Sequence, residues 1–204
     1  MDLVAKGKEI VINDKPIKKT LQLSLKEIFY GGMKKIKIRK LIFADAEKSH
    51  TFLKEKILTV PIKPGLPTGT EIIFTEEGDQ RPNRIPADII FTTEDKTHEI
   101  YKREGDNLLM TVDIVLKDAL LGTIVTVHTL DDRTFRVPIT SITTPDYRKY
   151  IPGEGLPFLQ NPNERGDLII NFKIDFPIYL SVASKNYMKK AFDNPVKDVT
   201  NKIV

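Results

Sequence analysis

Short runs in which apolar and polar residues alternate dominate the chain. The runs are rich in β-branched residues and end at Gly, Pro, Asn or Asp; they cover residues 54–63, 70–74, 89–93, 108–116, 123–129, 134–139 and 167–176. Alternation with a period of two is typical of a strand with one buried face, and such turn-forming residues bound strands. Because few long helical patterns interrupt the runs, the pattern predicts a mainly β fold built from sandwich-like sheets.

An internal repeat divides these strands into two halves. Residues 23–31 (LSLKEIFYG) return as residues 114–122 (IVLKDALLG), and in both an apolar strand enters a short helical turn that closes on glycine. An acidic residue suits the start of such a turn, and glycine suits its left-handed exit. Three further matches follow in the same order: the alternating Ile36 and Ile38 with 124–127, 60–62 (VPI) with 137–139 (VPI), and 86–91 (PADIIF) with 165–170 (RGDLII). The sequence therefore predicts two tandem, similar β-sandwich-like modules with short helical turns.

The matches of the repeat divide the chain into four predicted segments: a lead-in (1–19), a first module (20–97), a second module (98–178) and a C-terminal segment (179–204). The first module has extra residues at 44–56, which predict a longer hairpin or loop. Pro177 ends the last strand pattern. Ser181 can cap a helix over residues 182–192, in which Met188 and Phe192 lie one turn apart on one face.

Composition narrows the class of protein. Of the 204 residues, 40% are hydrophobic and 29% are charged, as in an ordinary folded domain. The absence of cysteine excludes disulfides, thiolate zinc sites and cysteine nucleophiles, and it fits a reducing compartment. No apolar run reaches the roughly 18 residues of a membrane span, and residues 1–6 (MDLVAK) lack the apolar core of a signal peptide. We therefore expect a cytoplasmic protein with no membrane partner.

The residues that carry enzyme chemistry are scattered. The three histidines His50, His98 and His128 lie far apart and form no metal-binding spacing. No nucleophile elbow, phosphate-binding loop or dinucleotide fingerprint is present. The acidic groups at 76–79 and 131–132 lack the alternate spacing of a calcium loop. The sequence predicts no catalytic residue, no metal and no cofactor, and the chain is not expected to be an enzyme.

A lysine-rich strand is the most informative feature. Net charge is only +4, but five basic residues fall within positions 34–40. Alternation puts Lys35, Lys37 and Arg39 on one face, and Lys34, Ile36 and Ile38 on the other. The lysines either protect an exposed strand from aggregation or attract an acidic peptide that pairs with the strand. A nucleic-acid partner is not expected, because the strand lacks the exposed aromatic residues of single-strand binders.

Several motifs occur in an order that identifies a family. They are 23–31 (LSLKEIFYG), 62–65 (IKPG), 77–80 (EGDQ), 85–91 (IPADIIF), 101–108 (YKREGDNL), 116–122 (LKDALLG), 129–134 (TLDDRT), 152–157 (PGEGLP) and 165–168 (RGDL). With them the chain resembles the C-terminal region of class B DnaJ (heat-shock protein 40) co-chaperones, from about residue 21 to residue 192. The His-Pro-Asp tripeptide of the J-domain and the family's Gly/Phe-rich linker are not in this sequence.

The resemblance implies a site and partners. The first module of the family has a shallow apolar groove that binds unfolded client polypeptides and the acidic C-terminal tail of a DnaK-type heat-shock chaperone. The matching groove residues here are Leu21, Ile36, Ile38 and Phe91, and the matching cationic residues are Lys34, Lys35 and Lys37. The C-terminal helix, with Met188 and Phe192, corresponds to the family's homodimer contact; alternatively, it packs back on the second module.

Three positions depart from the family pattern. Lys19 stands where an apolar groove residue is common, and Glu55 stands near a position where some relatives have a lysine that faces the groove. Both departures point to weaker binding of an acidic tail. Asp132, in 129–133 (TLDDR), replaces a glycine of most relatives, and this variant resembles the axonemal, radial-spoke subtype. A structural role in the ciliary axoneme is therefore the alternative to a general co-chaperone.

Overall fold

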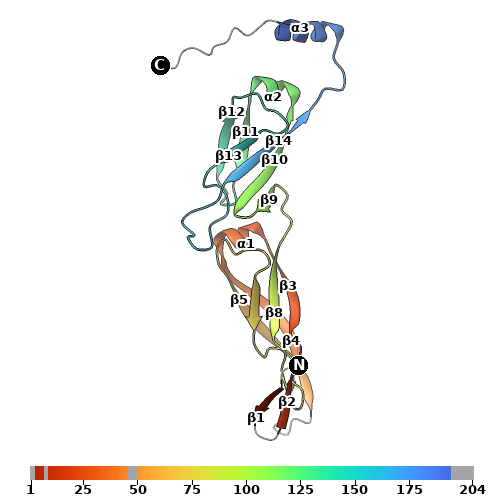
Figure 1. Ribbon diagram of the computed structural model, residues 1–204, viewed down its shortest axis with the longest axis vertical. Helices are drawn as coiled ribbons and strands as arrows, with labels where there is room; N and C mark the ends of the chain where they lie inside the picture. Colours follow the sequence, from red (N-terminus) through yellow and green to blue (C-terminus); the bar gives the residue numbers. More distant parts are fainter. Residues whose placement is uncertain (1–2, 7–8, 46–49, 194–204) are drawn as a thin grey trace.

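The protein is elongated, with two β-rich modules in line and a helix beyond the second (Figure 1). The computed structural model describes residues 3–6, 9–45 and 50–193. Strands predominate and helices are few, so the mainly β fold class is confirmed.

The first module has two layers, a three-stranded sheet in the order β3-β8-β6 and the two-stranded hairpin β4-β5. Its elements are β3 (Ile17–Leu23), α1 (Leu25–Tyr30), β4 (Gly32–Phe43), β5 (Thr51–Ile62), β6 (Glu71–Phe74), β7 (Arg84–Ile85) and β8 (Ile89–Asp95). The strand β7 joins β1 (Leu3–Lys6) and β2 (Glu9–Asn13) in a small separate sheet. The predicted insertion is thus a long hairpin rather than a loop, although residues 46–49 at its tip lie outside the described part.

The second module repeats this plan. Its elements are β9 (Tyr101–Glu104), β10 (Asn107–Val115), α2 (Leu116–Leu121), β11 (Thr123–His128), β12 (Thr134–Ile139), β13 (Arg148–Ile151) and β14 (Leu168–Asp175). A four-stranded sheet in the order β13-β14-β10-β9 faces the hairpin β11-β12. The equivalent pairs β3–β8 and β10–β14 are both parallel, and both hairpins follow a six-residue helix. The same order of elements twice confirms the predicted duplication.

The two short helices begin and end as the sequence predicts. In α1 the hydroxyl of Ser24 accepts a hydrogen bond from the Glu27 amide (3.2 Å), and the Glu27 carboxylate accepts one from the Ser24 amide (2.8 Å). This reciprocal capping satisfies two amides that the helix leaves unpaired. Gly31 (φ 68°) and Gly122 (φ 89°) end the two helices in the region that only glycine adopts easily. The sequence did not predict the short strands β1, β7, β9 and β13.

Most of the buried apolar side chains of both modules belong to one contiguous cluster. Ile28 and Val60 from the first module, and Leu156 and Ile170 from the second, have no measurable exposure. The strand β3 begins at Ile17, within the predicted lead-in, and the predicted module boundary after residue 97 falls between β8 and β9. The four-segment division stays a prediction, but the continuous core indicates that the modules are coupled.

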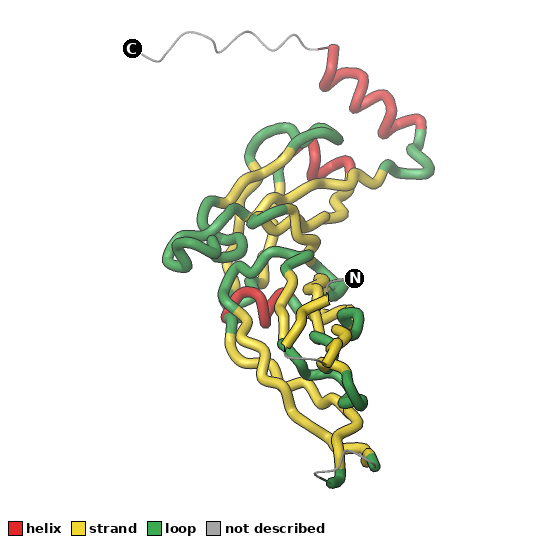
Figure 2. The backbone as a smooth tube through the Cα atoms, turned by 60° about the horizontal axis from the view of Figure 1, so that its bottom comes forward, coloured by secondary structure: helices red, strands yellow, loops and turns green. Residues whose placement is uncertain are grey.

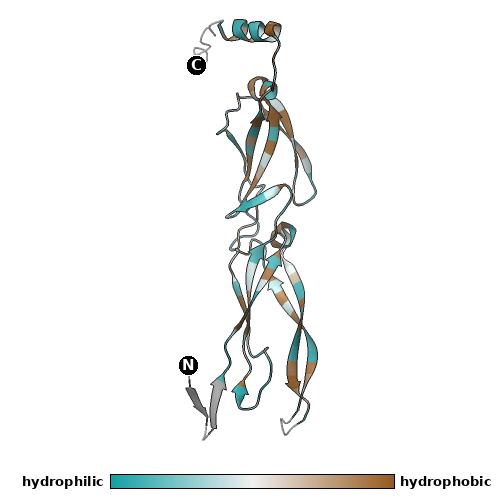
Figure 3. Cartoon of the chain, turned by 90° about the vertical axis from the view of Figure 1, so that its right-hand side faces the viewer, coloured by the Kyte–Doolittle hydropathy of each residue, from teal (hydrophilic) through white to brown (hydrophobic). Residues whose placement is uncertain are grey.

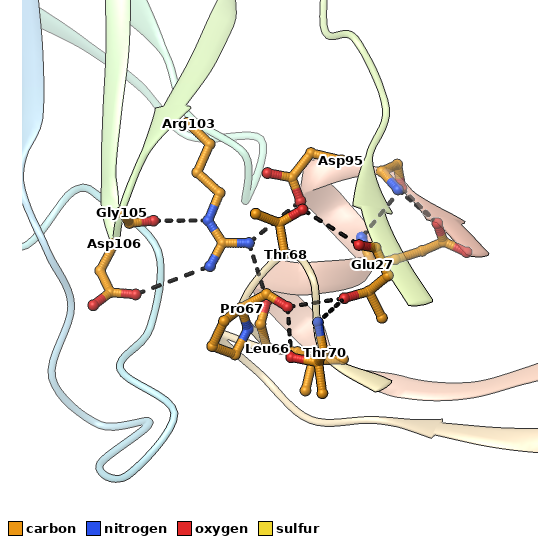
Figure 4. A network of polar contacts seen from close by, with 11 residues as sticks. Glu27, Leu66, Pro67, Thr68, Thr70, Asp95, Arg103, Gly105 and Asp106 are labelled. Carbon is orange, nitrogen blue, oxygen red and sulfur yellow. Dashed lines mark hydrogen bonds and ion pairs between the residues drawn. The ribbon is translucent and has the colours of Figure 1, made fainter. Parts of the chain in front are cut away.

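One arginine fastens the modules to each other (Figure 4). The guanidinium of Arg103, on β9, is only 7% exposed. It donates to the carbonyl of Leu66 in the first module (3.0 Å) and to that of Gly105 in the second (2.7 Å). It also contacts the carboxylates of Asp95 (3.4 Å) and Asp106 (4.0 Å). Since a guanidinium has five donors in a fixed fork, it can hold several acceptors in one geometry.

Candidate functional site

The strand β4 carries basic residues on one face and apolar residues on the other, as predicted. Lys35, Lys37 and Arg39 are exposed, whereas Ile36 is partly buried and Ile38 is buried. The hairpin has only one covered face. Because side chains alternate between the two faces of a strand, every second side chain of β4 points to solvent.

The far end of β4 is already occupied by a turn. The amide of Leu41 donates to the Asp79 carboxylate (2.8 Å), and its carbonyl accepts from the Gln80 amide (2.9 Å). The amide of Phe43 donates to the side-chain oxygen of Gln80 (2.9 Å). These bonds show that the odd-numbered residues of β4 direct their main-chain groups away from β5. The sequence marks residues 77–80 as a turn and gives no sign of this capping role.

The middle of β4 lacks such a cover. By the alternation of an antiparallel ladder, Lys35, Lys37 and Arg39 also direct their amides and carbonyls away from β5. Within the part of the chain that the structure describes, no other strand or loop donates to these groups or accepts from them. We call this stretch the β4 edge. An uncovered edge is a template for pairing with another extended segment.

The predicted groove residues come together, but mostly inside the core. Leu21 (5% exposed), Ile38 (3%) and Phe91 (2%) are almost completely buried, and Ile36 is partly buried against the same cluster. Of the four predicted groove residues, only Ile36 therefore presents appreciable apolar surface beside the β4 edge. Their role as a groove stays a prediction.

The predicted cationic residues differ in their availability. Lys34 is held by the Glu27 carboxylate (2.7 Å) and the Gln22 carbonyl (2.9 Å). Burial opposes ionisation of Glu27, but hydrogen bonds from Lys34 and Ser24 outweigh it and lower the pKa of Glu27. Lys35 is exposed and has no ion-pair partner among the described residues. Among the three predicted cations, Lys35 is thus the most available to a ligand.

Glu55 partly neutralises the basic face of the hairpin. Its carboxylate lies 2.5 Å from the ammonium of Lys37 and 3.1 Å from the guanidinium of Arg39. The hydrogen bond from Lys37, followed by that from Arg39, lowers the pKa of Glu55 despite some desolvation. A ligand carboxylate must therefore compete with Glu55 for Lys37, which gives a physical reason for the weaker acidic-tail binding that the sequence predicts.

A second carboxylate fixes the other face of the hairpin. Glu77 contacts Lys40 (2.7 Å) and Lys56 (2.5 Å), and its side chain is only 18% exposed. Burial disfavours the ionised form, but the two lysines together outweigh burial and hold the pKa of Glu77 below its ordinary value. These two ion pairs connect β4 and β5 to the capping turn at residues 77–80.

We expect Glu77→Gln to lower the free energy of unfolding by about 2 kcal/mol at pH 7, because a neutral amide leaves two lysines without their counter-ion. A folded-state pKa below the unfolded value means that this stability is present above about pH 4.5 and is lost as the pH falls through the folded pKa. Urea denaturation at pH 7 and pH 3 should therefore show the difference shrinking in acid. Glu55→Gln is the control, because the exposed Glu55 also binds two cations, and its effect should be much smaller at both pH values. An equal loss from both variants would contradict the argument.

The C-terminal helix α3 (Val182–Asp193) stands apart from the modules (Figures 1 and 2). The hydroxyl of Ser181 accepts from the Ser184 amide (3.1 Å), so the predicted cap is confirmed. None of the helix residues is buried; Met188 is partly exposed and Phe192 is 68% exposed. The structure contradicts the alternative in which the helix packs back on the second module, because such packing would bury one face of α3.

Other kinds of site receive no support from the described residues. None of their acidic or histidine side chains gather in groups of three that could hold a metal ion. None of the described helices is long and apolar enough to cross a membrane.

Comparison with known proteins places these features in a family. Residues 17–177 match the family model for the DnaJ C-terminal domain, which spans β3 to the end of β14. The chain belongs to the DnaJ family. It is 44% identical over 185 residues to the human DnaJ homolog subfamily B member 13, a match that covers 91% of this chain and 58% of the relative. The class B resemblance predicted from the motifs is confirmed.

Two other members of the DnaJ family are less similar to the chain. DnaJ protein homolog 1 of Drosophila melanogaster is 40% identical over 182 residues, which cover 89% of this chain and 54% of the relative. Protein SIS1 of Saccharomyces cerevisiae is 32% identical over 181 residues, which cover 88% and 49%. The chain thus spans about half of the length of the curated relatives it matches.

Proposed function

We propose that this chain is the substrate-binding region of a DnaJ co-chaperone, and that it holds unfolded client peptides and the acidic C-terminal tail of a DnaK-type heat-shock chaperone. The β4 edge carries the proposal. It offers uncovered main-chain groups beside Ile36 and the available cation of Lys35. Holding a peptide in this way requires no active site, so we infer that the chain is not an enzyme.

Strand addition suits such a role. A peptide that pairs with the β4 edge gains affinity from main-chain hydrogen bonds, which are independent of its sequence. The small apolar surface of Ile36 adds little preference, so binding is expected to be weak and tolerant of sequence. Lys35 favours an acidic tail, while Glu55 weakens that preference by occupying Lys37.

Dimerisation through α3 would convert weak sites into stronger binding. Helices of about a dozen residues are marginal alone in water, so a helix with no buried residue needs a partner surface. Its exposed apolar residues, including Met188 and Phe192, support a second copy of this chain as that partner. Two linked sites then bind a two-site client through effective concentration.

NMR titration with the acidic-tail peptide tests the tail site. Amide shifts should centre on Lys35, Ile36 and Lys37. We expect Lys35→Glu to weaken binding by about fivefold to tenfold, because it reverses an exposed charge beside the ligand. Lys117→Glu, which changes a lysine on α2 in the second module, is the control and should leave affinity unchanged. Unmoved β4 amides, or equal effects of the two substitutions, would refute the proposal.

A structural role in the ciliary axoneme is a second candidate, and Asp132 is the observation that favours it. Asp132 adopts φ 62°, a left-handed conformation that explains the glycine of most relatives. Its carboxylate also reaches the ammonium of Lys26 in the first module (2.8 Å), so it joins the two modules. Co-purification with axonemes, together with no suppression of client aggregation in vitro, would favour this role.

A further inference from the structure

The strand β5 is long and largely uncovered. It has 12 residues, whereas the equivalent β12 of the second module has six. Its first seven residues, 51–57, are all exposed, and burial begins only at Leu58. Figure 3 shows the β4-β5 hairpin as a layer of its own beside the three-stranded sheet, with apolar residues at its far end. The buried part of β5 corresponds to β12 in the second module. The duplication gives no structural role to the exposed part, residues 51–57.

The outer side of β5 has an open row of main-chain groups. The even-numbered residues of β5 make the main-chain hydrogen bonds to β4. The amides and carbonyls of the odd-numbered residues Leu53, Glu55, Ile57 and Thr59 therefore point outward. Pro61, in the same row opposite Met33, fits this orientation, since proline has no amide to offer β4. No described main-chain group bonds to this row. We call Leu53, Glu55, Ile57 and Thr59 the β5 edge; it lies on the opposite side of the hairpin from the β4 edge.

From Leu53 to Ile57, the two faces of β5 differ in chemistry. Leu53 (59% exposed) and Ile57 (61%) lie on one face, on either side of Glu55, which Lys37 and Arg39 already neutralise. On the other face stand Lys54, which has no ion-pair partner among the described residues, and Lys56, which shares Glu77 with Lys40.

We propose that the β5 edge binds an extended segment of a partner polypeptide in which apolar and acidic residues alternate. In a paired strand, directly opposite residues share a face. Apolar side chains of the segment then cover Leu53 and Ile57, and its carboxylates lie beside Lys54 and Lys56. The main-chain groups of the β5 edge supply the ladder. This site is independent of tail binding at the β4 edge.

Protection against aggregation and pairing between two copies both explain the β5 edge less well than an acidic partner segment does. Lysines on an edge strand discourage aggregation, but protection leaves Leu53 and Ile57 as unshielded apolar residues on the same edge. Pairing with the β5 edge of a second copy would bring the lysines of both strands together, and like charges across a ladder are destabilising. Charge therefore favours an acidic segment over a second copy.

The test uses the full chain and a synthetic seven-residue peptide of alternating valine and glutamate. We expect NMR shifts at Leu53, Glu55 and Ile57, and little change at Lys35. Ile57→Pro removes an outward amide without breaking the pairing with β4, as Pro61 already does, and should weaken binding at least about tenfold. Arg136→Pro, at an outward position of β12, is the matched control and should not change binding. Lys54→Gln should weaken it about twofold to fivefold.

Each contrary outcome overturns the proposal. A peptide that shifts only the amides of the β4 edge, or that binds Ile57→Pro as tightly as the unsubstituted chain, does not use the β5 edge. The same holds if a matched peptide of valine and lysine binds equally well. Self-association that Ile57→Pro abolishes would identify a second copy as the occupant instead. Circular dichroism confirms that each variant is folded, and the acidic-tail titration of Ile57→Pro reports on the β4 edge separately.

Discussion

Replacing Gly65 with alanine is expected to lower the free energy of unfolding by at least about 3 kcal/mol. A Cβ atom at this position would lie 2.0 Å from the Pro157 carbonyl oxygen and 3.0 Å from the Leu159 amide nitrogen. Both neighbours are main-chain atoms of the second module and cannot turn aside as a flexible side chain does. Gly65 also has φ 71°, which adds the cost of a left-handed alanine. The modules can remain in contact only if one of them shifts.

Gly69→Ala separates the two causes. Gly69 has φ 80°, but no atom lies within 4 Å of the position of its Cβ. Its substitution should cost only the backbone strain, about 1 kcal/mol. Urea denaturation of both variants measures the difference, and small-angle scattering of Gly65→Ala should reveal a changed angle between the modules. Equal losses of stability would show that the approach of the two modules at Gly65 is not tight.

Replacing Arg103 with alanine is the second large effect, with an expected loss of about 3 kcal/mol. The substitution leaves the Leu66 carbonyl without its guanidinium donor and the Asp95 carboxylate without its counter-charge at the module junction. Removing one partner of a buried charged pair costs more than the pair itself contributes, because the remaining group is desolvated and uncompensated. Chemical denaturation monitored by circular dichroism measures the loss.

Arg103→Lys tests whether the fork geometry matters as well as the charge. A lysine keeps the positive charge near Asp95, but its compact ammonium cannot reach the Leu66 and Gly105 carbonyls together as the guanidinium does. We expect it to recover less than half of the stability lost in Arg103→Ala. Full recovery would mean that charge alone holds the junction.

Local patterns in the sequence were enough to predict the units of this fold. The duplication, most strands, both glycine-terminated helices and the Ser181 cap follow from periodicity and end signals, which depend on neighbouring residues. The alternation in β4 likewise predicted which lysines face solvent. The strands β9 (YKRE) and β13 (RKYI) were missed because each has only four residues, at least half of them charged, so neither shows an apolar alternation.

The candidate site could be predicted only in part. The residues of the predicted groove do meet, because the strands that carry them belong to one module. Their burial could not be predicted, since a side chain in a strand is exposed or covered according to what packs on its face. Leu21 and Phe91 therefore turned out to belong to the core, while Leu53 and Ile57, which the sequence did not single out, are exposed.

Neighbouring residues along the chain specify the repeated strand-and-helix units, the positions of the basic residues and the family to which they belong. Which edges stay open and how the modules join depend instead on tertiary packing. Asp79 and Gln80 cap one end of β4, and Arg103 and Gly65 meet partners across the junction. These contacts link residues that are distant along the chain, so no local pattern encodes them. The two edges are open because nothing in the described chain reaches them, and that outcome depends on the packing of the whole molecule.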